Sequence, residues 1–524
     1  REISVHLAAK NTVLMEVRLI LGDQLNAEHS WFEQVNSDVI YVMFEMRQET
    51  NYVKHHIQKV VAFFGAMRNF AKARENEGHQ FLYYTLDDPE NEQDLTSNLN
   101  KVISLLEANR FAYQLPDEFR LDDQLRSFCK GLSIPSKSYD SEHFLTTRDE
   151  MAHFFEGKKK WVMEFFYRYM RKKFDILMVH DQPEGGSWNY DKFNRNKWNG
   201  SPDIPTPFYP KVDEIDVIQK MIEDEGIKTL GTFSKDDFLF PVTREESIAQ
   251  LDYFCEHLLA HFGTYQDAMH QEQTNLFHAR ISFALNAKII NPLEVINHAI
   301  DTYRKQPDVI SLSQVEGFVR QVLGWREYIR GLYWKEMPSY KKLNALENNN
   351  PLPDFYWTGK TKMNCLSTTI KNSLEHAYAH HIQRLMITGN FALLAQTHPD
   401  AVDEWYLGIY ADAVEWVQLP NTRGMSQYAD GGMVATKPYV SSGSYVNKMS
   451  NYCSSCSYNK KKRLGDDACP FNSLYWNFLD DKKDLLKSNN RMGMMLNLLR
   501  KINPEELAAI KTRAYEIIAN PDAY

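Results

Sequence analysis

Long apolar runs are missing from this chain. No uninterrupted apolar segment approaches the roughly 18 to 20 residues that cross a bilayer, and no charged, apolar and small-residue pattern marks a secretory signal. We therefore expect a cytoplasmic protein without a membrane span. Residues 1–14 precede Met15, after which a strand-like run begins, and we interpret them as an extension or expression remnant outside the fold.

A phosphate-binding glycine fingerprint is also missing after the first predicted strand. Apolar runs alternate with helical patterns in residues 15–145, which predicts an α/β unit with a doubly wound parallel sheet. Without the glycine-rich turn, this unit is not expected to bind a nicotinamide dinucleotide. The runs lie at 17–21, 39–44 and 81–86, and the helical patterns at 52–73 and 95–108.

Polar side chains follow the first two predicted strands. Asp23 and Gln24 come after one strand, and Glu45 and Glu49 come after the other. Open parallel sheets hold ligands in the crevice at the carboxyl ends of their strands. We predict a ligand site there, with simple turn and cap chemistry as the alternative.

The rest of the chain divides into a connection and a helical region. Residues 146–240 hold a helical stretch and then a segment rich in Gly, Pro, Asn and Asp at 181–210, typical of a long ordered connection. From 241 to 524, apolar residues recur at a spacing of three to four, which predicts a large all-α region.

The net charge of −9 argues mildly against nucleic acid as a partner, because phosphate binding requires clustered Lys and Arg. Basic runs nevertheless occur at 158–160, 171–173 and 460–463. Each run alone is typical of a solvated surface. In a DNA-binding protein, such runs are candidates for the DNA face.

Four of the six cysteines have a spacing typical of a metal site. Cys365 is followed far along the chain by Cys453, Cys456 and Cys469, and in a reducing cytosol this pattern favours a metal over disulfides. Tetrahedral zinc and a cubane iron-sulfur cluster would use the same thiolates. Pro470 after the last cysteine, with its aromatic and helical surroundings, favours the cluster.

The other two cysteines have apolar neighbours. Cys129 and Cys255 are interpreted as small buried hydrophobic residues.

The segments around the cysteines resemble the iron-sulfur bacterial cryptochromes and photolyases, most closely the prokaryotic (6-4) photolyases. The resemblance covers roughly residues 15–510. The matching segments are YCSSC at 452–456, RLGDDACPFN at 463–472, LILGDQL at 19–25, QDAM at 266–269, GWREY at 324–328, YWTGK at 356–360 and AHHIQRL at 379–385.

The resemblance implies a photolyase/cryptochrome fold. Its α/β antenna domain would bind a 6,7-dimethyl-8-ribityllumazine, with Asp23 and Glu49 as candidate polar contacts. Its all-α domain would bind FAD folded into a U and carry a 4Fe-4S cluster on Cys365, Cys453, Cys456 and Cys469. We expect the cluster to fasten the C-terminal region to the helical core.

The resemblance also assigns residues to the flavin. Trp325 and Arg326 match a signature helix that lines the flavin pocket; standing alone, they would be read as a packed amphipathic helix. Arg384 and Asp412 would pair beside the flavin ring, where the guanidinium stabilises the negative reduced form.

Gln418, His278 and Ser282 are further flavin candidates. Gln418 stands where the family aims a side chain at the flavin N5, and an amide cannot protonate N5, so the anionic reduced state is favoured. His278 and Ser282 lie in a segment that resembles the turn cradling the FAD phosphates.

Trp405, Tyr406 and Trp357 are the candidates for electron transfer to the flavin. The Trp-Gln-Trp element of many photolyases is missing after Gln418, so the customary chain of three tryptophans is incomplete. An individual tryptophan is otherwise typical of a core.

Residues for lesion chemistry follow from the same resemblance. His381 is assigned as the principal acid and His380 as its neighbour, because histidine transfers protons near neutral pH. Tyr439 and Tyr445 could contact an extruded lesion by stacking and hydrogen bonding. Two adjacent histidines are otherwise typical of a surface or a core.

Asp191 and Asp267 are expected near the DNA-facing rim. Carboxylates beside phosphate repel it unless a divalent cation bridges them, so we predict a bound magnesium ion.

Three functions compete. The first is light-driven repair of (6-4) photoproducts in UV-damaged DNA by a monomeric, FAD-dependent lyase. The second is a blue-light photoreceptor of the same family without repair activity. The third is a zinc-stabilised nucleic-acid binder without flavin.

Overall fold

The computed structural model describes residues 15–524 and begins with a five-stranded parallel sheet. The strand order is β3-β2-β1-β4-β5, so the chain winds outward in both directions from β1, as the sequence predicts for a doubly wound sheet. The strands are β1 (Glu16–Leu19), β2 (Val39–Phe44), β3 (Gln80–Tyr84), β4 (Arg110–Gln114) and β5 (Ser136–Tyr139).

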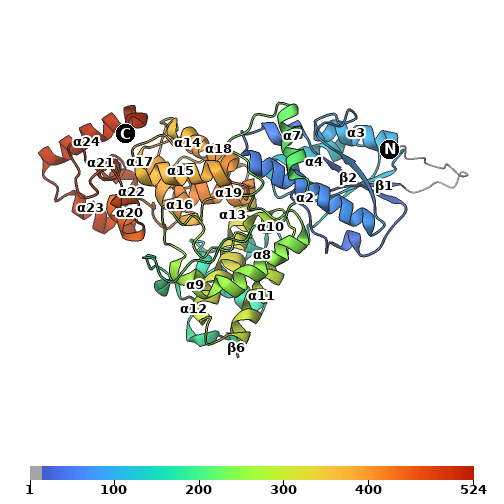
Figure 1. Ribbon diagram of the computed structural model, residues 1–524, viewed down its shortest axis with the longest axis horizontal. Coiled ribbons are helices and arrows are strands. Elements are labelled where there is room, and N and C mark those ends of the chain that lie inside the picture. Colours follow the sequence, from blue (N-terminus) through green and yellow to red (C-terminus); the bar gives the residue numbers. More distant parts are fainter. Residues whose placement is uncertain (1–14) are drawn as a thin grey trace, which may run out of the picture.

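Helices cover both faces of this sheet, at the right of Figure 1. Successive residues at the end of β1 and within β2 alternate between two separate cores: Ile20, just after β1, and Tyr41 face one, and Leu19 and Val42 face the other. The helices are α1 (Arg47–Asn51), α2 (Ile57–Asn76), α3 (Leu95–Leu105) and α4 (Phe119–Gly131).

The two cores differ in extent. The core between the sheet and helices α3 and α4 is confined to the α/β domain. The core beneath α2 continues without a break into the helical region, so this face of the sheet is fastened to the rest of the molecule by apolar packing.

The connection after the sheet returns to it. It contains α5 (Glu150–Phe154), α6 (Met163–Lys173), a short β6-β7 hairpin (Met178–Val179 and Gln182–Pro183) and α7 (Ile215–Asp224). Helix α7 packs against α2, above the sheet in Figure 1. The connection therefore contributes a helix to the sheet's surface.

The remainder is helical and forms the lower and left parts of Figure 1. It opens with α8 (Arg244–His257), which begins at Thr243 because the threonine hydroxyl accepts a hydrogen bond from the Glu246 N–H. The others are α9 (Leu259–Tyr265), α10 (Ser282–Asn286), α11 (Pro292–Lys305), α12 (Leu312–Val319), α13 (Glu327–Glu336), α14 (Phe355–Thr358), α15 (Asn364–His376), α16 (His381–Gln383), α17 (Asn390–Leu394), α18 (Pro399–Ile409), α19 (Glu415–Leu419), α20 (Gly443–Met449), α21 (Pro470–Asp481), α22 (Lys483–Leu486), α23 (Gly493–Leu499) and α24 (Pro504–Ala519).

Three segments of this region are π-helical: η4 (Arg320–Arg326), η6 (Arg384–Gly389) and η7 (Pro420–Ser426). A π-turn inserts a residue into the helix and redirects the side chains around it, and such turns concentrate at functional sites. Among the described residues no helix is both long and apolar enough to cross a membrane. The expected extension at residues 1–14 lies outside the described part of the chain.

Candidate functional site

The carboxylate of Asp412 gathers three segments of the helical region. Arg384 donates to its two oxygens at 2.9 and 3.2 Å, and the Ser282 hydroxyl donates to Oδ2 at 2.7 Å. The Asn286 carboxamide donates to the Asp412 main-chain oxygen at 2.6 Å. The structure therefore brings the predicted flavin residues Arg384, Asp412 and Ser282 together.

Arg326 joins this group through Asn286. Its guanidinium donates to the Asn286 carboxamide oxygen and, at 2.9 Å, to the Leu285 carbonyl oxygen and the His143 ring. Burial lowers the pKa of Arg326 to about 10, so the side chain remains charged at neutral pH. Asn286 and His143 were missed in the sequence, because neither belongs to a recognisable motif.

The π-helical segments place several of these side chains. Arg384 opens η6 and Arg326 closes η4, while Gln418 lies in α19 just before η7. Gln418 is buried and donates to the Thr422 hydroxyl. Trp325 is partly exposed and packs edge-on against Tyr328.

Aromatic rings lead from the interior to Arg384. Trp405 contacts Tyr406 and Tyr410 with ring centroids 5.1 and 5.9 Å apart, and the Arg384 guanidinium lies 3.8 Å from the Tyr410 ring centre. The Tyr406 hydroxyl lies 2.6 Å from the Thr388 hydroxyl. Trp357, in α14, is partly exposed at the edge of the core.

Histidines from two segments meet beside this site. The rings of His278 and His380 stack with centroids 4.6 Å apart, and His278 is also a predicted contact of the FAD phosphates. Burial lowers the pKa of His278 to about 4 and that of His380 well below its usual value. His381 is accessible but surrounded by protein, and this desolvation lowers its pKa to about 4.

The predicted rim residues share one neighbourhood that includes Arg195. Asp191 is paired with Arg195 and, at 3.4 Å, with Arg320. Burial, with the nearby charge of Asp191, raises the pKa of Asp267 to about 6. The charges of Asp267 and Arg195 act on the pKa of both Tyr439 and Tyr445. The rim acids and the predicted lesion tyrosines therefore lie close together.

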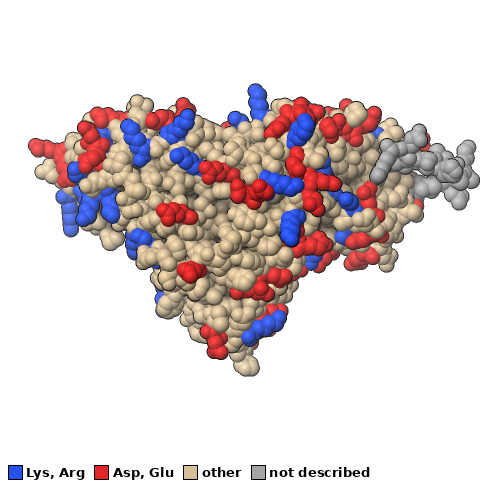
Figure 2. Space-filling view, viewed as in Figure 1, with Lys and Arg blue, Asp and Glu red and all other residues tan. Residues whose placement is uncertain are grey.

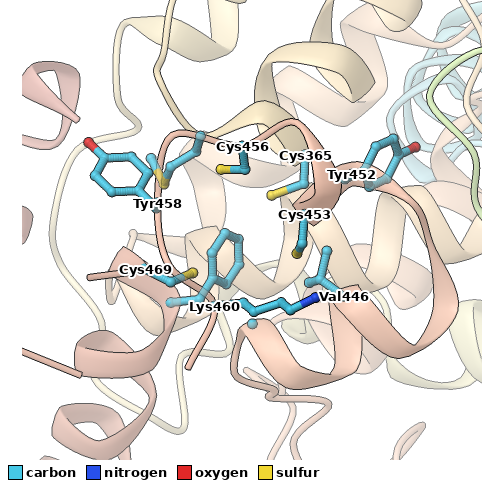
Figure 3. A pocket seen from close by; sticks show the side chains of 11 residues that line it. Cys365, Val446, Tyr452, Cys453, Cys456, Tyr458, Lys460 and Cys469 are labelled. Atoms are coloured by element: carbon cyan, nitrogen blue, oxygen red, sulfur yellow. The ribbon is translucent and has the colours of Figure 1, made fainter. Parts of the chain in front are cut away.

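Four cysteines line one cavity, whose empty space is about 340 Å³ when the adjoining open solvent is included. Figure 3 shows Cys365, Cys453, Cys456 and Cys469 arranged around a shared space. Burial and the neighbouring thiols raise the pKa of Cys469 to about 12 and that of Cys453 to about 11. Within residues 15–524, no three His, Cys, Asp or Glu side chains converge tightly enough to hold a single metal ion.

A larger cavity lies between the sheet and the helical region, and its empty space is about 1000 Å³ when the adjoining open solvent is included. Its lining includes Asp23 and Glu49, beyond the carboxyl ends of β1 and β2, and residues 413–416 from the flavin side. Gln24 and Glu45 are fully buried outside this lining. Gln24 bonds backbone groups, and Glu45 accepts two hydrogen bonds from Arg68.

Lys and Arg gather near α23, at the lower left of Figure 2, whereas acidic and basic side chains intermix over the sheet. The exposed cations of this end include Lys487, Arg491, Arg500 and Lys501. The negative net charge therefore conceals a locally basic surface.

Comparison with known proteins agrees with this architecture. The model of the deoxyribodipyrimidine photo-lyase-related protein family matches residues 18–238. A (6-4) photolyase of Agrobacterium fabrum is 43% identical over 483 residues, which cover 92% of this chain and 94% of that protein.

Solved structures show the same fold. A bacterial class III photolyase from Agrobacterium tumefaciens superposes with a TM-score of 0.56 at 13% identity, covering 98% of this chain and 99% of that one. A Synechocystis cryptochrome gives a TM-score of 0.55 at 13% identity, covering 93% and 99%. The fold is that of the photolyases, and by its 43% identity over nearly the full length of a known member the chain belongs to the (6-4) photolyase family.

Proposed function

We propose that this protein repairs (6-4) pyrimidine-pyrimidone photoproducts in UV-damaged DNA, using light and reduced FAD. The observation that carries the proposal is the 43% identity to a (6-4) photolyase over 94% of that protein's length. When bound and photoexcited, reduced FAD supplies the electron that starts repair.

The residues around Asp412 fit a flavin. The Arg384 guanidinium is paired with the Asp412 carboxylate and lies buried beside the proposed ring site. Three buried atoms of the segment before α10 have no hydrogen-bond partner: Asn275 Oδ1, His278 Nε2 and Arg280 Nη1. An unpaired buried guanidinium nitrogen suits a phosphate, so this segment would hold the polar half of FAD.

The paired histidines would handle the proton that repair requires. His381 is accessible and its low pKa keeps it neutral at pH 7, so it can accept a proton or pass one on from a partner. His380 has two buried ring nitrogens without partners and stacks on His278. Tyr439 and Tyr445 would then contact the lesion from the opposite segment.

For the cysteines, we propose a 4Fe-4S cluster. Cys365, Cys453, Cys456 and Cys469 surround one cavity and would supply the four thiolates that hold a cubane cluster. A single zinc ion needs sulfurs about 2.3 Å from one centre, and no such tight set occurs among the described residues. Iron and acid-labile sulfide analysis decides between them.

For the interdomain cavity, we propose a lumazine antenna. The cavity joins apolar walls, such as Phe63 and Met67, to carboxylates at Asp23, Glu49 and Glu118. Rings would pack on the former, and ribityl hydroxyls and ring N–H groups would donate to the latter.

We also propose magnesium between Asp191 and Asp267. Asp267 makes no ion pair in the described structure and feels the charge of Asp191, which a divalent cation would relieve. The Arg195 pair with Asp191 would have to open. A repair rate that ignores both chelator and added magnesium would rule this out.

The deciding experiment is repair of an oligonucleotide with one defined (6-4) lesion, in light and in darkness. Light-dependent restoration of the two bases supports repair. Flavin reduction without restoration would instead select the photoreceptor, and a colourless protein the flavin-free DNA binder.

A further inference from the structure

Tyr452 lies between the cysteine cavity and the histidines. It precedes Cys453, its side chain is fully buried, and its hydroxyl oxygen accepts a hydrogen bond from the Gln383 carboxamide at 3.0 Å. Figure 3 shows the Tyr452 ring directed away from the cysteines. Tyr452 therefore lines the cysteine cavity, and its hydroxyl contacts Gln383 in the neighbouring helix α16.

On the helix side, Gln383 secures the start of α16. Its carboxamide oxygen accepts a hydrogen bond from the His380 N–H at 3.2 Å. Helix α16 has only three residues, His381–Gln383, before the π-helical η6 begins at Arg384. Helix α16 is the first turn of one helix that continues through η6 and α17 to Leu394. Because the N–H groups of a first turn lack intrahelical partners, the Gln383 side chain that closes this turn helps to fix where His380 and His381 lie.

On the cysteine side, Tyr452 holds two cysteine-bearing segments together. Its carbonyl oxygen accepts a hydrogen bond from the Asn364 carboxamide at 2.8 Å, and Asn364 directly precedes Cys365. Asn364 also donates to the Ser455 hydroxyl at 3.1 Å, between Cys453 and Cys456. Whatever draws Cys365 and Cys453 together must therefore also fix the position of Tyr452.

We propose that Tyr452 is a positioning residue that couples occupancy of the cysteine site to the geometry of His380 and His381. The proposal rests on the function proposed above for the cysteines and the histidines. A filled site restrains Cys365 and Cys453, which holds the Tyr452 phenol against Gln383 and closes the first turn of α16. An empty site releases the phenol, and the histidines lose their fixed orientation.

The test is Tyr452→Phe, which keeps the buried ring and removes only the hydroxyl. The expected product binds wild-type amounts of iron and flavin. Its repair kcat falls about 10-fold or more with little change in KM, and its pH profile shifts, because the lost hydrogen bond positions the histidines that relay the proton and does not position the substrate. Tyr41→Phe is the matched control, since it removes a buried phenol that donates only to the Trp31 carbonyl in the sheet domain.

A second readout does not depend on activity. His380 is only 3% exposed, so diethyl pyrocarbonate should label it slowly in the wild-type protein. We expect labelling of His380, measured by peptide mass spectrometry, to rise several-fold in Tyr452→Phe. The fraction of iron-depleted wild-type protein that stays folded and soluble should show the same rise, and iron depletion of Tyr452→Phe should add nothing.

Gln383→Leu tests the link from its other end. The Gln383→Leu and Tyr452→Phe changes combined should reduce kcat no further than Gln383→Leu alone, because Gln383→Leu breaks the hydrogen bond to Tyr452 and also the one from the His380 N–H. Multiplying effects, or unchanged His380 labelling in Tyr452→Phe, would overturn the coupling. Absence of iron from wild-type protein would instead refute the cluster, so the two failures are distinguishable.

Discussion

Arg384 donates hydrogen bonds to both carboxylate oxygens of Asp412, which lies 28 residues later in the chain, at 2.9 and 3.2 Å. The guanidinium also lies over the Tyr410 ring, and its Nε donates to the Ala379 carbonyl oxygen at 2.6 Å. Both side chains of the pair are more than four-fifths buried. A hydrogen-bonded ion pair of this kind fixes the separation between the start of η6 and the turn before α19, which would border the flavin ring.

Replacing Asp412 with asparagine tests this arrangement. The change leaves the Arg384 cation without its counter-charge and weakens the bond from Ser282, at a cost of about 2 kcal/mol in the free energy of unfolding. Flavin bound per protein, read from visible absorption after gel filtration, should fall at least several-fold. Asp308→Asn, at an exposed position, should retain flavin, and full flavin in Asp412→Asn would contradict the assigned site.

Acid should destabilise the protein through His56. Its Nδ1 accepts from the Gln58 N–H and its Nε2 donates to the Leu374 carbonyl oxygen, and burial lowers its pKa to about 4. Between pH about 6.5 and 4 the unfolded chain binds a proton here that the folded chain does not, so stability falls with falling pH, by up to about 3 kcal/mol.

Chemical denaturation at a series of pH values measures this slope. His56→Asn retains a cap for α2 and should flatten the slope over that window. His153→Asn, whose side chain is 69% exposed, should leave it unchanged. A slope that survives in His56→Asn would assign the acid sensitivity to other buried histidines.

Cys456→Ala should lose the proposed cluster and much of the soluble protein. The cluster would tie α15 to the C-terminal segment, so its loss releases both. Iron content and the soluble fraction after expression are the measurements, with Cys129→Ala as the control. A folded, repair-competent and iron-free variant would show that the cluster is dispensable for structure.

Electron supply should run through Trp405 and Tyr406. Replacing either residue with phenylalanine should slow photoreduction of oxidised flavin about 10-fold or more. Removing an oxidisable ring lengthens the electron-transfer step, and the tunnelling rate falls steeply with distance. Repair by chemically reduced protein should be unaffected. Trp476→Phe, in α21, is the control, and a slow Trp357→Phe variant would add Trp357 to the route.

Glu49→Gln should weaken antenna binding. Glu49 lines the interdomain cavity and accepts hydrogen bonds from Arg120 at 2.8 and 3.0 Å, so neutralising it disturbs a polar wall of that cavity. Lumazine content should fall several-fold and the near-ultraviolet band of the repair action spectrum should shrink, while flavin content stays constant. Glu75→Gln, exposed on α2, provides the comparison.

The sequence predicted the fold well where apolar residues are regularly spaced. Strands β1, β2 and β3 were expected from such runs, whereas β5, with the sequence SKSY, is polar and mostly exposed at the edge of the sheet. The expected helix at 52–73 begins instead at Ile57, where His56 caps it. Local pattern cannot indicate pairing that depends on a neighbouring strand.

The sequence predicted those residues of the candidate site that lie in recognisable motifs. Arg384, Asp412 and Ser282 were named from resemblance, and they meet in the structure. Asn286, Arg195 and Tyr410 were missed, because their contacts depend on π-turns and on chain segments brought together only by folding. His278 stacks on His380, which no sequence spacing indicates.

Residues 413–416 wall the interdomain cavity, and residue 413 directly follows Asp412. Lys59 of α2 fastens the same turn, donating to the carbonyl oxygens of Leu407 and Ala413 at 2.8 and 2.7 Å. One stretch of backbone would thus border both proposed ligand sites, so an antenna pigment that stiffened it would lower the entropy lost when flavin binds. Because linkage is reciprocal, each chromophore should tighten the other's binding by the same factor.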